Sequence, residues 1–257
     1  TVVENLQDLI ATVREQKADV GIGYDGDADR IGAVDERGEI LWGDRLMIVY
    51  ARDILTQRPG TTFISEVKAS QCLYDDIAAK GGRPIMWKTG HSLMKAKLKA
   101  ESAVLAGEMS GHMFFADRYF GFDDAIYASC RLVEILAKTK QSLSSLVADL
   151  PPTTVTPEIR VDCPDTLKFQ LVDQVRRQLT TYLNAGKPVG ASNLRLRELV
   201  TIDGVRAIFE DGWGLIRASN TQPALVLRFE APSPARLDVI RATIETELAQ
   251  ARRVLSA

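Results

Sequence analysis

The stretch TFISEVKASQCLYDDIAAKGGRPIMW, residues 62–87, decides the fold class. It reads as an apolar strand from Thr62 to Val67, a helix from Ser70 to Lys80 and a second strand from Arg83 to Trp87. Gly81-Gly82 gives the stop between helix and strand. A helix from Asp44 to Leu55 precedes this unit and another helix starts at Ser92, so the alternation predicts an α/β layer.

The preceding segment predicts a helix, a strand and a hairpin. Apolar residues recur at helical spacing from Leu6 to Val13, and residues 18–24 form a short apolar run. Residues 31–34 and 39–42 read as two strands joined by a turn that contains Gly38. An acidic loop, residues 25–30, lies between the strand and the hairpin, and we therefore expect functional residues in this loop.

The pair Pro151-Pro152 is the best domain boundary, and different elements follow it. Helices are expected at residues 167–183 and from Pro234, a further helix is expected before the boundary, after Asp123-Asp124, and Asp203-Gly204 predicts a two-residue hairpin. Strands are expected at residues 154–161, 200–202, 205–209, 214–217 and 225–229. The predicted fold class is therefore α/β: a mixed-sheet α/β/α domain followed by a smaller α+β domain with an antiparallel sheet backed by helices.

Composition narrows the classes of function. The net charge of the 257 residues is -2 with both signs interspersed, which gives no electrostatic support for binding nucleic acid or an anionic membrane. No apolar run approaches the roughly 20 residues of a membrane span, so a cytoplasmic location is expected. Three widely spaced cysteines, Cys72, Cys130 and Cys163, favour reduced thiols over a disulfide framework or a zinc site.

The acidic loop predicts a metal site. Asp25, Asp27 and Asp29 alternate with small residues, and in an extended segment residues two apart point the same way, so the three carboxylates should converge. Such a cluster would repel itself unless a cation compensated it. Hard oxygen ligands at this spacing suit Mg²⁺, which keeps positions open for phosphate oxygens or water.

Three alternatives exist for this loop. Asp25, Asp27, Asp29 and Glu36 match positions 1, 3, 5 and 12 of a calcium-binding loop, but Arg30 stands where that loop needs glycine. Glycines 21, 23 and 26 match the spacing of a dinucleotide-binding fingerprint, yet no helix is expected to follow. A purely structural Asp-rich turn is the third alternative.

The segment DGDADR, residues 25–30, resembles the metal loop of the α-D-phosphohexomutase superfamily, in particular its bacterial phosphomannomutase/phosphoglucomutase branch. Three further segments resemble the same branch in the same order: WKTGHS at 87–92, GEMSGH at 107–112 and RASNTQP at 217–223. In that superfamily four domains surround a cleft, and the reacting serine lies in a Ser-His-Asn loop that this sequence lacks. The resemblance therefore implies a remnant of the second domain at residues 1–39, the third domain at 40–150 and the fourth at 151–257.

The resemblance also implies roles for individual residues. Asp25, Asp27 and Asp29 would hold Mg²⁺, and Arg30 would reach the phosphoryl group or the sugar, although a surface ion pair is the alternative. Either His91 or His112 would exchange a proton with the reacting hydroxyl. The substrate-binding residues would be Glu108 and Ser110 for the sugar hydroxyls, Lys68 near the substrate, and a clamp for the non-reacting phosphate formed by Arg217, Ser219, Asn220, Thr221 and Arg228.

The implied activity is the interconversion of hexose 1-phosphate and hexose 6-phosphate, on mannose or glucose, through a phosphoserine enzyme and a hexose 1,6-bisphosphate. The expected partners are these sugar phosphates and the N-terminal domains of the same protein. Because the serine loop is absent, the chain is expected to be inactive by itself. Phosphoglucosamine mutase and a non-catalytic phosphate- or metal-binding module are the alternatives.

Overall fold

The computed structural model describes residues 3–256, which divide into two compact units at residues 150 and 151. The first unit begins with the 3-10 turn η1 (Val3–Leu6) and helix α1 (Gln7–Gln16). These precede a small antiparallel sheet of three strands, β1 (Val20–Tyr24), β2 (Ile31–Asp35) and β3 (Ile40–Leu41). The expected hairpin is confirmed: Gly38, at φ +82°, donates its N–H to the Asp35 carbonyl at 2.9 Å.

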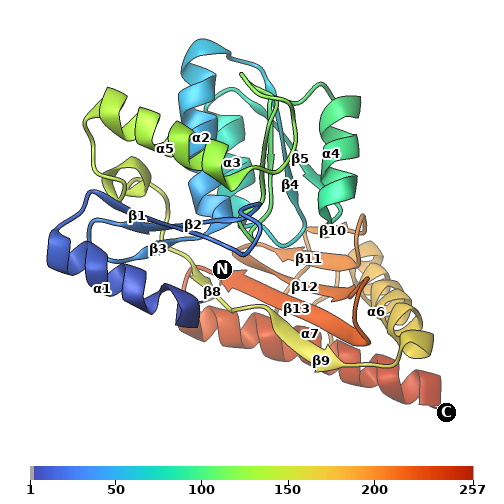
Figure 1. Ribbon diagram of the computed structural model, residues 1–257. Coiled ribbons are helices and arrows are strands. Elements are labelled where there is room, and N and C mark those ends of the chain that lie inside the picture. Colours follow the sequence, from blue (N-terminus) through green and yellow to red (C-terminus); the bar gives the residue numbers. More distant parts are fainter. Residues whose placement is uncertain (1–2, 257) are drawn as a thin grey trace. The chain divides into compact units, whose positions relative to one another are not determined.

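The rest of the first unit is a four-stranded sheet between helices, and Figure 1 shows these layers. The strand order is β5-β4-β6-β7, in which the first three strands are parallel and the last is antiparallel. The strands are β4 (Thr62–Glu66), β5 (Arg83–Trp87), β6 (Leu105–Gly107) and β7 (Met113–Phe115). The helices are α2 (Gly43–Gln57), α3 (Gln71–Ala79), α4 (His91–Ala100) and α5 (Ala125–Thr139), followed by the turn η2 (Ser145–Val147).

Alternation along β4 explains why helices cover both faces of this sheet. Phe63 belongs to the core that contains residues of α2, α3 and α5, whereas its neighbour Ile64 belongs to a smaller core with Met94 and Leu98 of α4. Adjacent residues of a strand point to opposite faces, so both faces must be covered by apolar side chains. The mixed-sheet α/β/α prediction is therefore confirmed.

The second unit is an antiparallel sheet with two long helices. The sheet order is β10-β11-β12-β13-β8, with β9 also pairing with β13. Its strands are β8 (Thr154–Val155), β9 (Ile159–Asp162), β10 (Glu198–Val200), β11 (Val205–Phe209), β12 (Gly212–Ala218) and β13 (Ala224–Ala231). The helices α6 (Asp165–Ala185) and α7 (Pro234–Ser256) share one apolar core with the sheet. This confirms the predicted α+β architecture.

The second unit differs from the sequence predictions in three details, of which the first is that the strand expected at residues 200–202 lies at Glu198–Val200. The single strand expected at residues 154–161 is two strands, because Pro157 lies between them and cannot donate a ladder hydrogen bond. Asp203-Gly204 is not a two-residue hairpin: Val200 pairs with Arg206, and four residues, 201–204, connect β10 to β11. None of the described helices combines the length and the hydropathy that a bilayer-spanning segment needs.

Candidate functional site

The acidic loop joins β1 to β2, and it is a turn rather than the extended segment expected from its sequence. Ala28 has a left-handed conformation, with φ +59°, and its N–H donates to the Asp25 carbonyl at 3.2 Å. The carboxylates still meet: Asp25, Asp27 and Asp29 each offer an oxygen, and the three oxygens lie within 4.8 Å of one another. The turn, and not strand alternation, brings them together.

Arg30 closes this loop by pairing with two of the aspartates. Its Nε lies 2.5 Å from Asp25 Oδ2 and 3.5 Å from Asp29 Oδ1. Burial opposes ionisation of Asp25, but hydrogen bonds from the Arg30 backbone and guanidinium outweigh it and hold the pKa of Asp25 below its ordinary value. Arg30 is therefore bound to the carboxylate cluster itself.

The donor set suits a divalent cation. All three side chains are carboxylates, the hard oxygen ligands that Mg²⁺ prefers. Oδ1 of Asp29 is buried and accepts no hydrogen bond within the described part of the chain. Arg30 Nε, 3.5 Å away, offsets the charge of this oxygen in part without a hydrogen bond, so the oxygen can still bind a cation and the residues fit a bound metal ion. The flanking elements are strands, and Glu36 instead binds Ser144, which argues against a calcium-binding loop.

A second loop, residues 108–112, lies directly against the acidic loop. Arg30 and His112 form an isolated antiparallel bridge, and Ile31 donates its N–H to the Gly111 carbonyl at 3.1 Å. His112 Nε2 lies 3.3 Å from Asp29 Oδ2. The two loops named by separate sequence motifs are thus neighbours in space.

His112 also organises the side chains of its own loop. Its Nδ1 lies 3.0 Å from Glu108 Oε2 and 2.9 Å from Ser110 Oγ. Burial lowers the pKa of His112, but Glu108, followed by Asp29 and Asp123, outweighs burial and raises that pKa above its ordinary value. Burial likewise opposes ionisation of Glu108, yet the hydrogen bonds from His112 and from the Gly90 N–H hold the pKa of Glu108 below its ordinary value.

His91 and Lys68 lie at the edges of this network. The ring centroids of His91 and His112 are 6.4 Å apart, and His91 Nδ1 lies 4.0 Å from Asp123 Oδ2. Lys68 Nζ lies 3.5 Å from Oε2 of Glu66, a fully buried carboxylate. Every site residue that sequence reasoning proposed in the first unit therefore connects to the same network.

Two members of the network were missed at the sequence level. Asp123 was identified only as part of a helix start, yet it contacts His91 and accepts a hydrogen bond from Lys95 at 3.0 Å. Glu66 reads as an ordinary charged residue within a strand. Neither residue carries a motif, so only its spatial neighbours identify it.

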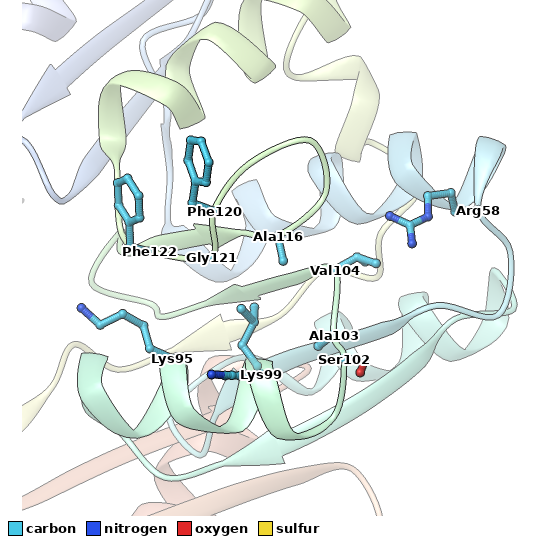
Figure 2. A pocket seen from close by; sticks show the side chains of 11 residues that line it. Arg58, Lys95, Lys99, Ser102, Ala103, Val104, Ala116, Phe120, Gly121 and Phe122 are labelled. Carbon is cyan, nitrogen blue, oxygen red and sulfur yellow. The ribbon is translucent and has the colours of Figure 1, made fainter.

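A cavity of about 700 Å³ adjoins the network through Lys95 (Figure 2). Its cationic lining also includes Arg58 and Lys99, and Arg58 is paired with Asp117 at 2.9 Å. Phe120, a residue that is 84% exposed, also lines the cavity. The cavity contains none of the residues that the sequence motifs predicted, so we assign the candidate site to the network of loops.

The second unit carries the remaining candidates on and after β12. Arg217 is buried and donates to Asp203 Oδ2 at 3.1 Å. Arg217 stands opposite Val226, and Leu215 stands opposite Arg228, so Arg217 and Arg228 share one face of the sheet. Both arginines are almost completely buried, as expected for a site that needs fixed guanidinium groups.

The loop after β12 is held in shape by hydrogen bonds. Ser219 Oγ accepts from the N–H groups of Thr221 and Gln222 at 3.4 and 3.2 Å. Lys168 of α6, which sequence reasoning did not select, donates its Nζ to the carbonyls of Ser219 and Gln222 at 2.6 and 3.0 Å. Asn220 and Thr221 remain exposed and can offer their side chains to a ligand.

Comparison with known proteins gives consecutive matches along the chain. Residues 2–38 match the model of phosphoglucomutase/phosphomannomutase α/β/α domain II, residues 42–154 match domain III, and residues 158–247 match the C-terminal domain of the same family. The chain is 48% identical to a phosphomannomutase/phosphoglucomutase of Pseudomonas putida over 245 residues. That alignment covers 95% of this chain and 50% of the relative.

The chain belongs to the phosphoglucomutase/phosphomannomutase family. A phosphoglucomutase of Neisseria gonorrhoeae is 43% identical over 93% of this chain and 49% of that protein. A crystal structure of a family protein from Burkholderia thailandensis matches with a TM-score of 0.85 and 42% identity, over 97% of this chain and 50% of that one. The chain thus spans about half the length of the curated relatives it matches, and the predicted place in the α-D-phosphohexomutase superfamily is confirmed.

Proposed function

We propose that this chain supplies the metal, sugar and phosphate sites of a phosphohexomutase. The reaction is the reversible movement of a phosphoryl group between positions 1 and 6 of mannose or glucose, through a phosphoserine and a hexose 1,6-bisphosphate. The observation that carries the proposal is the convergence of Asp25, Asp27 and Asp29 against the loop of Glu108 and His112. The names of relatives at 43–48% identity support mannose and glucose as the sugars.

Within this proposal Asp25, Asp27 and Asp29 hold Mg²⁺. The ion, when bound, neutralises charge on the phosphoryl group during its transfer. Arg30 keeps the acidic loop closed through its hydrogen bond to Asp25, and the other N–H groups of its guanidinium can donate to a phosphoryl oxygen.

Sugar recognition falls to the loop of residues 108–112. Glu108 can accept a hydrogen bond from one sugar hydroxyl while Ser110 donates to a neighbouring one. The two carboxylate oxygens of Glu108 are already held by the Gly90 N–H and by His112, so the carboxylate is fixed before the sugar arrives. One of the two histidines, His91 or His112, transfers the proton of the reacting hydroxyl.

The second unit holds the phosphate that does not react. Arg217 and Arg228 supply guanidinium groups, and the loop residues Ser219, Asn220 and Thr221 supply further donors. A phosphate dianion suits this set, because charge-assisted hydrogen bonds from arginine to phosphate are among the strongest in proteins. Lys68, at the edge of the sugar loop, completes the substrate-binding set in the first unit.

The reacting serine has to come from protein outside this sequence, because no Ser-His-Asn segment occurs in it. We therefore expect the isolated chain to show no mutase turnover with mannose 1-phosphate or glucose 1-phosphate, while retaining weak binding of these sugar phosphates. Turnover by the purified 257-residue chain would contradict this expectation.

The direct test of the proposed function is Asp27→Asn in a full-length protein that contains this segment. Turnover should be lost, because residue 27 would bind the metal ion at the transferring phosphoryl group more weakly. The affinity for mannose 1-phosphate should change less than about threefold. Steady-state kinetics and calorimetric binding separate the two effects. A variant with near-normal turnover would reject the metal assignment.

Asp8→Asn, on the exposed surface of α1, is the matched control for the same chemical change. A metal titration of the chain itself adds a second test, because a calcium preference with no binding of sugar phosphate would favour a non-catalytic module instead.

A further inference from the structure

Glu66 is the one carboxylate of β4, and its surroundings differ from those of an ordinary strand residue. Its side chain is 0% exposed. Burial, only partly offset by Lys68 and by hydrogen bonds, raises the pKa of Glu66 above its ordinary value. A buried carboxylate costs several kcal/mol in lost hydration, and an apolar residue of similar volume usually serves stability as well or better. Stability alone therefore does not explain a carboxylate at this position.

The contacts of Glu66 reach three different loops. Oε1 accepts a hydrogen bond from the Met109 N–H at 3.1 Å. Oε2 accepts one from Thr89 Oγ1 at 2.5 Å and lies 3.5 Å from Lys68 Nζ. These partners follow β6, β5 and β4 respectively, the three parallel strands of the sheet.

The topology explains how one side chain can do this. β4 is the central one of the three parallel strands, and Glu66 is its last residue. The carboxyl ends of parallel strands lie at one edge of a sheet, where ligand-binding loops gather. A long acceptor at the end of the middle strand therefore reaches the first residues of the loops on both sides.

We propose that Glu66 is a positioning residue that sets the relative placement of the three loops carrying Lys68, His91 and Glu108. It touches neither substrate nor metal. It fixes the backbone of Met109 between the two sugar-reading residues, fixes Thr89 two residues before His91, and limits where the Lys68 ammonium can go. The link between the loops stands on the contacts alone, whereas its effect on sugar-phosphate binding rests on the proposed function.

The experiment compares the chain with Glu66→Gln and Glu66→Ala by hydrogen exchange of backbone amides. Glu66→Ala removes both acceptors, so the amides of residues 88–92 and 107–112 should exchange faster together, that of Met109 by about tenfold or more. Glu66→Gln keeps one acceptor oxygen and should show a smaller effect. Unchanged exchange in Glu66→Ala, or faster exchange in only one of the two loops, would overturn the proposal.

Thr62→Val is the control within the same strand, because Thr62 Oγ1 accepts a part-buried hydrogen bond from Arg83 Nε, 3.0 Å away, at the opposite end of β4. This control should leave exchange in both loops unchanged, and a general loosening of β4 in it that reproduced the Glu66 pattern would also overturn the proposal.

Calorimetric titration with mannose 1-phosphate gives the second readout. The affinity should fall at least tenfold in Glu66→Ala and stay unchanged in Thr62→Val. If the unmodified chain binds no mannose 1-phosphate, the proposed function is at fault while the exchange result still decides the role of Glu66. If the chain binds the sugar phosphate and Glu66→Ala binds it equally well, the positioning role in binding is refuted.

Discussion

Gly111 lies in a backbone conformation that side chains rarely adopt, with φ +104°, and a Cβ atom there would stand 2.3 Å from the Ile31 carbonyl oxygen. We expect Gly111→Ala to lower the free energy of unfolding by about 3 kcal/mol or more, because backbone strain and a steric clash add. Gly60 also has positive φ, +77°, but no atom lies within 4 Å of the point that a Cβ atom would occupy. Gly60→Ala should therefore cost only about 1 kcal/mol, and equal losses in urea unfolding would contradict the clash.

Glu247 of α7 offers a pH-dependent test. Its side chain is 1% exposed, and neither carboxylate oxygen accepts a hydrogen bond within the described residues. Burial raises the pKa of Glu247, and Tyr182 lowers it by a smaller amount, so the pKa lies above its ordinary value. The folded protein therefore keeps this proton to a higher pH than the unfolded chain, in which the group titrates near 4.5. The contribution of the protonated Glu247 to the free energy of unfolding is therefore present below about pH 4.5, and it is lost as the pH rises through the pKa of Glu247 in the folded protein.

The expected result for Glu247→Gln follows from that sign. Glutamine stays neutral at every pH, so the variant should gain stability relative to the parent between pH 4 and pH 8. Urea unfolding monitored by tryptophan fluorescence, to which the buried Trp213 contributes, measures the difference. Glu245→Gln, at an exposed pair with Arg241, controls for the loss of a surface carboxylate. A stability difference that is the same at both pH values would contradict the assignment.

The sequence predicts the identity of the site residues better than the geometry that joins them. The three aspartates, Asp25, Asp27 and Asp29, do converge, but they do so through the left-handed turn at Ala28. No local sequence pattern predicts a positive φ at an alanine. Glu66 could not be found because its importance comes from loops that lie 23 and 43 residues further along the chain.

Helix α5 is anchored by a buried ion pair. Arg131 donates to the carboxylate and the carbonyl of Asp117, at 3.1 and 3.0 Å, and its guanidinium lies 4.8 Å from the Phe115 ring centroid. Arg131→Met should lower the free energy of unfolding by about 3 kcal/mol, since Asp117 loses its buried partner, while the pair with the half-exposed Arg58 remains. Arg118→Met, at the exposed pair with Glu134, should cost less than about 1 kcal/mol. Similar losses in chemical denaturation would show that the buried pair contributes little.

Among the elements, helices with strong periodicity were predicted well, whereas two of the short strands were missed. The helices at residues 43–57 and 125–139 match apolar stripes of several turns. β6 and β7 were missed because each has three residues, too few for alternation to show. The loop between α6 and β10 also carries no periodic signal, and its course depends on tertiary contacts.

The apolar clusters of the first unit are separate from the cluster that α6, α7 and the antiparallel sheet form in the second unit. A unit with its own core can in principle fold alone. We therefore expect residues 151–257, expressed by themselves, to unfold cooperatively in urea with a buried-to-exposed change at Trp213. Absence of a cooperative transition, with circular dichroism of an unstructured chain, would show that this core is insufficient.

The N–H of Ala125, the first residue of α5, donates to the carbonyl of Ala28 at 3.0 Å. The tip of the aspartate turn is therefore tethered to the start of a helix. An ion that tightens the turn should slow deuterium uptake at this one amide, and an ion that spreads the turn should speed it. The exchange rate of the Ala125 amide thus reports how the turn responds to different cations, and it can be measured in solution without any substrate.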